Sequence, residues 1–214
     1  MLGPPWEPAP SAWSLHGRRL ATAPPDTVRF TRALQIAERR PILGAVNVCL
    51  EVTALQDRVD LMGLLLDPAR PPVSRRQIDR IADDLCLHVT GWQRWILERL
   101  WRNTFEAWPL VGGRLLADGV DVAAMPVAAA SAAVFATWRH RFEHDGDAWR
   151  KWSDALVREP PRKIRRDIEE SAAGQAEADF AAAQALMQDA ADAAQPAAGD
   201  SLIHMGESDT LGET

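Results

Sequence analysis

Two histidines and two aspartates at the end of one predicted helix come closest, by type and spacing, to a metal site. His140 and His144 lie four residues apart, and Asp145 and Asp147 follow them. Two imidazoles on one helix face with a nearby carboxylate are a familiar ligand set for zinc. Such a site also needs a fourth ligand and an ordered second shell, which the surrounding sequence does not supply. We therefore interpret these residues as a solvated helix end and predict no metal site.

Asp145 and Asp147 also flank Gly146 in the manner of a calcium-binding loop. That loop requires a bidentate glutamate at its last position, and here Leu156 occupies it. We therefore expect no calcium site.

The two cysteines, Cys49 and Cys86, are far apart and belong to no CxxC pair or zinc spacing. We expect them to be buried thiols, because free cysteine is among the most buried residue types. The chain also lacks the glycine-rich phosphate loops, the GxSxG motif of hydrolases and the HExxH motif of zinc proteases. These observations predict a protein without catalytic residues, cofactor or metal, and an enzyme with a diffuse site is the alternative.

Arginines and tryptophans interleave between residues 75 and 102, as they do in binding sites for single-stranded nucleic acids. The arginines are Arg75, Arg76, Arg80, Arg94, Arg99 and Arg102, and the acids that interrupt them are Asp79, Asp83, Asp84 and Glu98. The whole chain has a net charge of -6. Because a nucleic-acid binder gains affinity by neutralising phosphates, this balance favours a protein partner instead.

Three segments of different composition divide the 214 residues. Residues 1–26 hold six of the fifteen prolines, and we predict an extended or disordered arm whose Trp6 and Trp13 could dock elsewhere. Residues 27–161 have helical periodicity and predict a helical core domain. Residues 167–214, after a basic cluster at 162–166, hold eleven acidic side chains and no Lys or Arg. For this acidic, alanine-rich tail we predict a helix over 167–194 and disorder from Pro196.

Local signals place the first helices of the core domain. An amphipathic helix is predicted from Thr27 to the proline at position 41. Period-two spacing of the valines at 46, 48 and 52 favours a strand, but the surrounding apolar period is helical, and we predict helix over 42–66. Ser74 and Gln77 have the spacing of a capping box, and Gly91 is placed to close the helix that Ser74 begins.

Later helices are predicted over residues 92–108, over 127–142 and from Asp147 to the proline pair at 160–161. Gly112 and Gly113 are expected to loosen the chain between the first two of these. Helical spacing and large apolar area predict that five residues of the first helix belong to the core: Trp92, Trp95, Leu100, Trp101 and Trp108.

The sequence predicts neither export nor a membrane span. The first residues lack the basic start and apolar stretch of a secretory signal. The apolar region between Leu50 and Leu66 is interrupted by Glu51, Asp57 and Asp60, well short of a spanning helix.

The segment from residue 74 to 161 resembles the tail assembly chaperones of long-tailed (siphovirus-type) phages that infect GC-rich actinobacteria. The likeness lies in Thr90-Gly91-Trp92 with Trp95, in Trp108 followed by Gly112-Gly113 and Leu115-Leu116, in Gly119-Val120-Asp121, and in Glu159-Pro160-Pro161 at the end. Gln93 and Arg94 depart from the pattern, since the family often has Pro or adjacent tryptophans there.

The resemblance implies a chaperone that binds the helical tape-measure protein in the host cytoplasm, keeps it soluble and is absent from the mature virion. The sequence leaves the partner-binding residues unknown and self-association open. A structural virion protein or head-tail connector of helical build is the alternative function.

Overall fold

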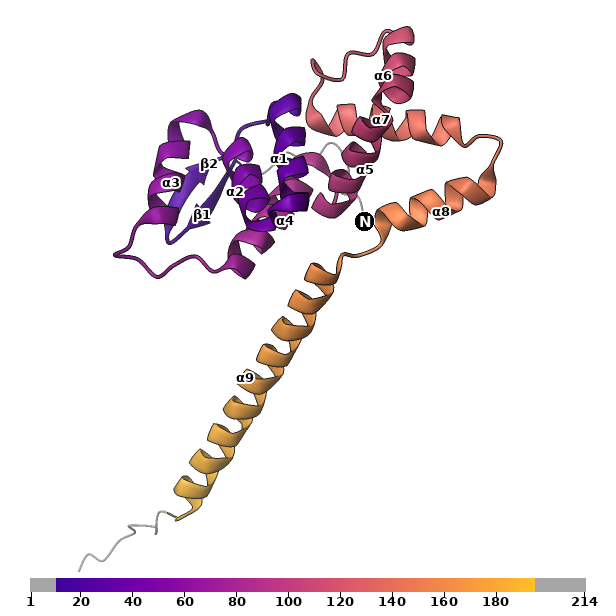
Figure 1. Cartoon of the computed structure of the whole chain (residues 1–214). Coiled ribbons are helices and arrows are strands. Elements are labelled where there is room, and N and C mark those ends of the chain that lie inside the picture. Colours follow the sequence, from indigo (N-terminus) through magenta and orange to yellow (C-terminus); the bar gives the residue numbers. More distant parts are fainter. Residues whose placement is uncertain (1–10, 195–214) are drawn as a thin grey trace, which may run out of the picture. The chain divides into compact units, whose positions relative to one another are not determined.

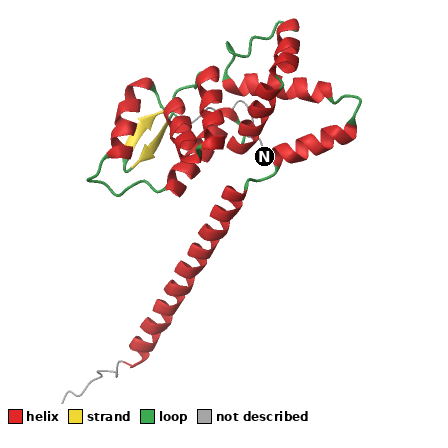
Figure 2. Ribbon diagram, viewed as in Figure 1, coloured by secondary structure: helices red, strands yellow, loops and turns green. Residues whose placement is uncertain are grey.

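The computed structural model describes residues 11–194, which form mainly helices and one two-stranded sheet (Figures 1 and 2). The predicted mainly helical fold is confirmed. The chain divides into two compact units between Pro161 and Arg162. The predictions for Trp6 and for the segment from Pro196 onward lie outside the described residues.

Residues 11–26 are not a simple extended arm. Strand β1 (Ala12–Leu15) pairs antiparallel with β2 (Arg18–Ala21), and Leu15 and Leu20 are buried in the core. His16 and Gly17 form the turn with positive φ angles of 49° and 76°, as a tight hairpin requires. Trp13 does dock, because its indole N–H donates to Oγ1 of Thr53 at 3.2 Å. The prediction of an arm over these residues was wrong because the prolines flank the hairpin without interrupting it.

The first helices follow the hairpin closely. Helix α1 (Thr27–Arg39) begins at Asp26, whose carboxylate accepts from the Arg29 N–H, and α2 (Pro41–Val52) starts at a proline. Residues 46–52 are therefore helical and not a strand. A 3₁₀ turn, η1 (Leu55–Asp57), leads directly into α3 (Arg58–Leu66).

Helix α4 (Arg75–Thr90) has the predicted ends. The Ser74 hydroxyl accepts from the Gln77 N–H at 3.1 Å, and Gly91 closes the helix in the left-handed conformation. Helix α5 (Arg94–Glu106) is shorter than the predicted 92–108, since a new helix, α6 (Trp108–Ala117), begins with Pro109 in its first turn. Helix α6 runs through Gly112 and Gly113, so the predicted loosening there is wrong.

Helix α7 (Val127–Arg141) confirms the predicted helix after Pro126. Helix α8 (Gly146–Val157) is capped by Asp145, whose side chain accepts from the Ala148 N–H, and not by Asp147 as predicted. Helix α9 (Pro161–Ala194) covers the predicted alanine-rich helix and starts at the second proline of the pair. None of the described helices is long and apolar enough to cross a membrane.

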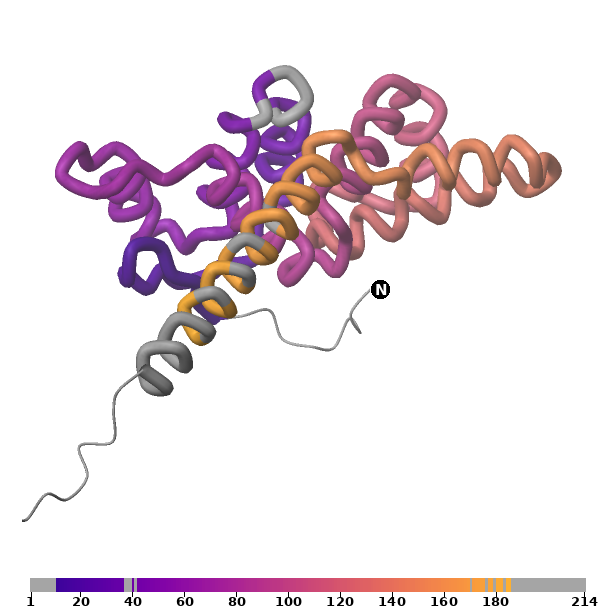
Figure 3. The backbone as a smooth tube through the Cα atoms, turned by 90° about the horizontal axis from the view of Figure 1, so that it is seen from below, coloured from indigo at the N-terminus to yellow at the C-terminus, as the bar shows by residue number. Residues whose placement is uncertain are grey.

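Helix α5 joins two groups of elements within the first unit. On one side the hairpin and helices α1 to α4 pack around Phe30, Leu34 and Val48, and on the other side lie α6, α7 and α8 (Figures 1 and 3). Helix α5 contacts α1 and α4 in the first group and all three helices of the second. The second group is therefore held mainly by α5, with smaller contacts from α1 and α4 to α7.

Candidate partner-binding surface

The residues considered for metal binding do not converge. Nδ1 of His140 lies 3.0 Å from Oε2 of Glu143, His144 is exposed, and Asp145 is the α8 cap. Among the side chains that the structure describes, no group of three or more His, Cys, Asp or Glu is placed to hold a metal ion.

Both cysteines are buried, as predicted. Burial raises the pKa of Cys49 and of Cys86 from 9.0 to about 12. Both thiols are therefore protonated near neutral pH, a state that disfavours nucleophilic chemistry because the thiolate is the reactive form.

Arg94 is not part of a basic surface, because its side chain is fully buried between α4 and α5. Its Nε donates to Oδ1 of Asp83 at 2.6 Å, Nη2 donates to Oδ1 of Asp79, and Oε1 of Glu98 lies 3.8 Å away. Burial alone would lower the pKa of Arg94, but the carboxylates of Asp83, Glu98 and Asp79 raise it. This cluster fastens α4 to α5 and leaves Arg94 inaccessible to nucleic acid.

Arg99 is committed to the end of α8. Its guanidinium donates to the carbonyl oxygens of Ala155 at 2.9 Å and Leu156 at 3.1 Å, and also to that of Arg158. The last carbonyls of a helix lack partners within it, and a cation there also offsets the helix dipole. Arg75, Arg76 and Arg80 remain exposed on α4. The interleaved arginines, which the sequence did not assign to nucleic-acid binding, are thus divided between buried or helix-capping positions and exposed positions.

The predicted Trp-rich core is confirmed in part. Trp95, Leu100 and Trp101 are buried, and Trp92 is half-buried against the core. Trp108 was wrongly assigned to the core, since 39% of its surface is exposed.

The buried rings of α5 and α7 also have their polar atoms partnered. Indole Nε1 of Trp101 donates to Oγ of Ser131 at 3.0 Å, and that of Trp138 donates to Oγ1 of Thr104 at 3.0 Å. Hydrogen bonds of this kind remove the cost of burying an indole N–H.

Large apolar side chains lie in solvent where α5 passes into α6. We define the α6 surface by four of them, Phe105, Trp108, Leu110 and Leu116, which are 41%, 39%, 56% and 71% exposed. The rings of Phe105 and Trp108 are adjacent, with centroids 6.1 Å apart, and Phe105 in turn contacts the buried Trp101 at 5.7 Å. The exposed rings therefore continue outward from the core.

Gly112 fixes the position of the Trp108 ring. A Cβ atom at residue 112 would lie 2.6 Å from Cε2 of Trp108, closer than real carbon atoms approach. The ring therefore lies flat against the α6 backbone at Gly112. This contact explains why a glycine, which costs a helix about 1 kcal/mol relative to alanine, stands within α6.

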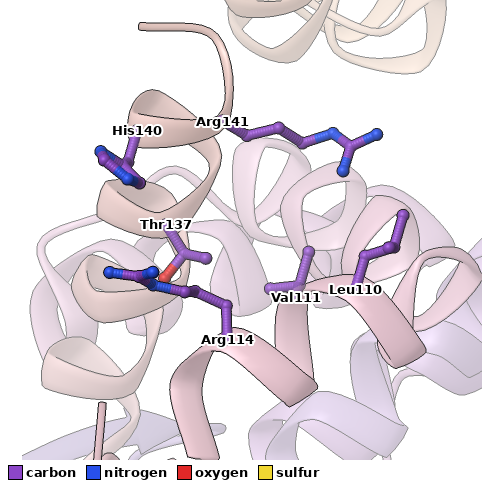
Figure 4. Close-up of a pocket in the computed structure, with 6 residues that line it drawn as sticks. All are labelled: Leu110, Val111, Arg114, Thr137, His140 and Arg141. Carbon is purple, nitrogen blue, oxygen red and sulfur yellow. The ribbon is translucent and has the colours of Figure 1, made fainter. Parts of the chain in front are cut away.

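A groove with a cavity volume of about 180 Å³ lies between α6 and α7 beside these side chains. Leu110, Val111 and Arg114 line it from α6, and Thr137, His140 and Arg141 line it from α7. Figure 4 shows Arg114 extending toward Thr137 and His140, while Arg141 extends over the side of α6 that carries Val111 and Leu110. The groove thus has apolar walls beneath basic side chains.

Acidic neighbours partly neutralise the groove. Nε of Arg114 lies 2.8 Å from Oδ2 of Asp118, and Glu143 pairs with His140. The guanidinium of Arg141 lies 5.9 Å from the centre of the Trp138 ring. A ligand helix with an apolar stripe and a carboxylate at its edge would match this chemistry.

Aromatic stacking holds α8 against α7. The ring of Trp152 stacks on Trp138 with centroids 5.3 Å apart, and Trp149 contacts Phe135 at 5.4 Å. Arg99 holds the end of α8, and the rings of α8 pack against α7. Helix α8 thus supports α7, which forms one wall of the groove. The sequence did not predict the α6 surface as a binding surface, and it placed Trp108 in the core, because a helical apolar pattern does not tell which residues a neighbour covers.

No match to the chain is found among known protein family models, curated proteins or solved structures.

Proposed function

We propose that the protein is a tail assembly chaperone of a long-tailed phage, which binds the tape-measure protein in the host cytoplasm through the α6 surface and is not an enzyme. The observation that carries the proposal is the exposure of Phe105, Trp108, Leu110 and Leu116 where α5 passes into α6. The identity of the partner rests on the resemblance of residues 74–161 to the chaperone family.

The chemistry of the surface supports a helical partner. Exposed apolar side chains next to a groove suit an amphipathic helix that lays its apolar face on them. Aromatic residues such as Trp108 contribute most to interfaces of this kind. A tape-measure protein, with long apolar helical stripes, is a partner that needs such cover while it is unassembled.

A structural virion protein or head-tail connector is the second candidate, because an exposed apolar surface also suits permanent assembly. The two candidates differ in where the protein ends up. A chaperone is missing from finished particles, whereas a connector is present at fixed stoichiometry.

Co-expression with the cognate tape-measure protein tests the proposal. We expect the tape-measure protein to become soluble and to co-purify with the chain. Because the contacts are mainly apolar, the complex should persist at moderate salt, whereas a nucleic-acid partner would dissociate steeply as salt rises.

Washed virions provide the second arm of the test. Absence of the chain from virions, together with tape-measure binding, supports the chaperone. Constant stoichiometry in virions without any gain in tape-measure solubility would instead establish the structural alternative.

A further inference from the structure

Helix α3 and the preceding turn η1 present a second exposed apolar face, in a different part of the first unit. We define the α3 stripe as Leu55, Val59, Met62 and Leu66, which are 75%, 79%, 37% and 72% exposed. Three of these values exceed the exposure of every residue of the α6 surface. Only Leu61 of the same helix is buried.

Polar contacts attach the start of α3, which has a small share of the core, to the hairpin and to the end of α2. Nη2 of Arg18 donates to Oδ2 of Asp60 at 2.6 Å, and Oδ2 of Asp57 accepts from the Ala21 N–H at 2.6 Å. Nε of Arg58 donates to the carbonyl oxygen of Thr53 at 3.1 Å. These contacts set the direction in which α3 leaves the hairpin, so the stripe is presented on a helix whose first turn is already anchored.

The spacing of the stripe is that of a helix seam. Its residues are four, three and four positions apart, as are alternating d and a positions of a coiled coil. Val59, Met62 and Leu66 lie on α3, and Leu55 lies in the 3₁₀ turn η1 that leads into it. The order four, three, four reads the same in both directions. A twofold axis between Val59 and Met62 therefore places Val59 opposite Met62 of a second chain, and Leu55 opposite Leu66.

Charge also favours an identical partner. The acids beside the stripe are already paired within the chain, Asp60 with Arg18 and Asp67 with Arg70 at 3.1 Å. Two copies thus approach without a facing pair of uncompensated like charges, and nothing along the stripe selects a strongly charged partner.

We propose that the protein forms an antiparallel homodimer through the α3 stripe, independently of the partner bound on the α6 surface. Contact over one short helix is smaller than the standard interface of about 1,600 Å², so the dissociation constant should be on the order of micromolar or weaker. Twofold, isologous contacts are the commonest way for identical chains to associate.

Sedimentation velocity of the full chain over a wide concentration range measures the association. We expect the sedimentation coefficient to rise from that of the monomer toward that of the dimer. Val59→Asp should weaken the dimer by roughly tenfold or more, since it places a charge in the apolar seam. The matched control is Leu116→Asp, which changes an apolar side chain 71% exposed on α6, against 79% for Val59, and should leave the dimer unchanged.

Disulfide trapping tests the geometry. Mixing the Val59→Cys and Met62→Cys variants under mild oxidation should give the mixed dimer in preference to either self-linked dimer. Cys49 and Cys86 are buried and add little background. Self-linking of Val59→Cys alone would overturn the antiparallel arrangement.

Three results would overturn the proposal itself. They are a wild-type chain that stays monomeric at the highest concentration, a dimer that Val59→Asp leaves intact, and a monomer whose Val59→Asp variant loses the tape-measure protein. The last result would assign the stripe to the partner instead of a second copy.

Discussion

Helices α5 and α6 follow each other in sequence, but corresponding large side chains are buried on α5 and exposed to solvent on α6. Trp101 on α5 is buried and its indole N–H is hydrogen-bonded, whereas Trp108 on α6 leaves 39% of its surface in solvent. Arg94 on α5 is enclosed by carboxylates, whereas Arg114 on α6 has a side chain that is 53% exposed. Trp101 and Arg94 of α5 therefore hold the fold together, whereas Trp108 and Arg114 of α6 are accessible to a partner.

Replacing Arg94 should give the largest contrast between the two helices. Arg94→Met leaves Asp83 and Asp79 without their cation in a buried setting, and breaking such a pair costs about 3–5 kcal/mol of unfolding free energy. The matched change Arg114→Met removes an exposed ion pair and should cost less than about 1 kcal/mol. Urea unfolding of both variants measures the difference. Equal losses of unfolding free energy would show that the ion pairs of Arg94 contribute no more to stability than an exposed pair does.

Tryptophan truncation compares the same helices by packing. Trp101→Ala should reduce the free energy of unfolding by about 3–5 kcal/mol, because it removes a buried ring and its hydrogen bond to Ser131. Trp108→Ala should cost less than about 1.5 kcal/mol, since water already covers much of that ring. Thermal or urea denaturation with intrinsic fluorescence tests both values. A loss at Trp108 as large as that at Trp101 would return Trp108 to the core.

Unfolding at alkaline pH tests the burial of the two cysteines. Because the folded-state pKa of Cys49 and Cys86 is raised from 9.0 to about 12, their contribution to stability is complete below pH 9 and is lost as the pH rises toward 12. The unfolding free energy should fall by about 1.4 kcal/mol per pH unit for each cysteine above pH 9.

The composition of the chain makes this slope measurable. The sequence has no tyrosine, and Lys151 and Lys163 are its only lysines, so few other side chains titrate in this range. The Cys49→Ala, Cys86→Ala double variant should have a much shallower slope, whatever its stability at neutral pH. An unchanged slope would mean that the thiols are not shielded from water.

Removal of residues 167–214 should have the smallest effect. The described side chains of this segment include few large apolar groups, and Phe180 is 64% exposed. We expect the melting of residues 27–161, followed by circular dichroism, to change by no more than about 0.5 kcal/mol. Loss of the cooperative transition would show that α5 and its neighbours depend on the tail.

Features set by local interactions were predictable from the sequence. Ser74 and Gly91 mark the ends of α4 because a capping hydroxyl and a left-handed glycine act within one helical turn. The helical state of residues 46–52 was also correct, since the surrounding apolar period outweighed the β preference of valine.

The predictions that were wrong concern features that depend on contacts between residues far apart in the sequence. Burial of Arg94 depends on α4 crossing α5, although the four-residue spacings of Asp79 with Asp83 and of Arg94 with Glu98 were a signal of paired helix faces. Gly112 stands within α6 because the Trp108 ring occupies the space that a Cβ atom at residue 112 would need. The exposure of Trp108 and Leu116 follows from the absence of a covering element within the described chain, which the pattern of a single helix does not specify.

The most direct test of the central claim is tape-measure binding by a chain whose α6 surface is altered and whose fold is intact. We would co-express the tape-measure protein with the Trp108→Ala, Leu116→Ser double variant and with Val157→Ser, a control that changes an apolar side chain 55% exposed on α8. Both variants should unfold cooperatively. The account predicts that the double variant recovers at most roughly a tenth of the tape-measure protein retained by the wild type, a loss of about 1.4 kcal/mol or more in binding, while the control retains it fully. Full retention by the folded double variant would contradict the assignment of the α6 surface.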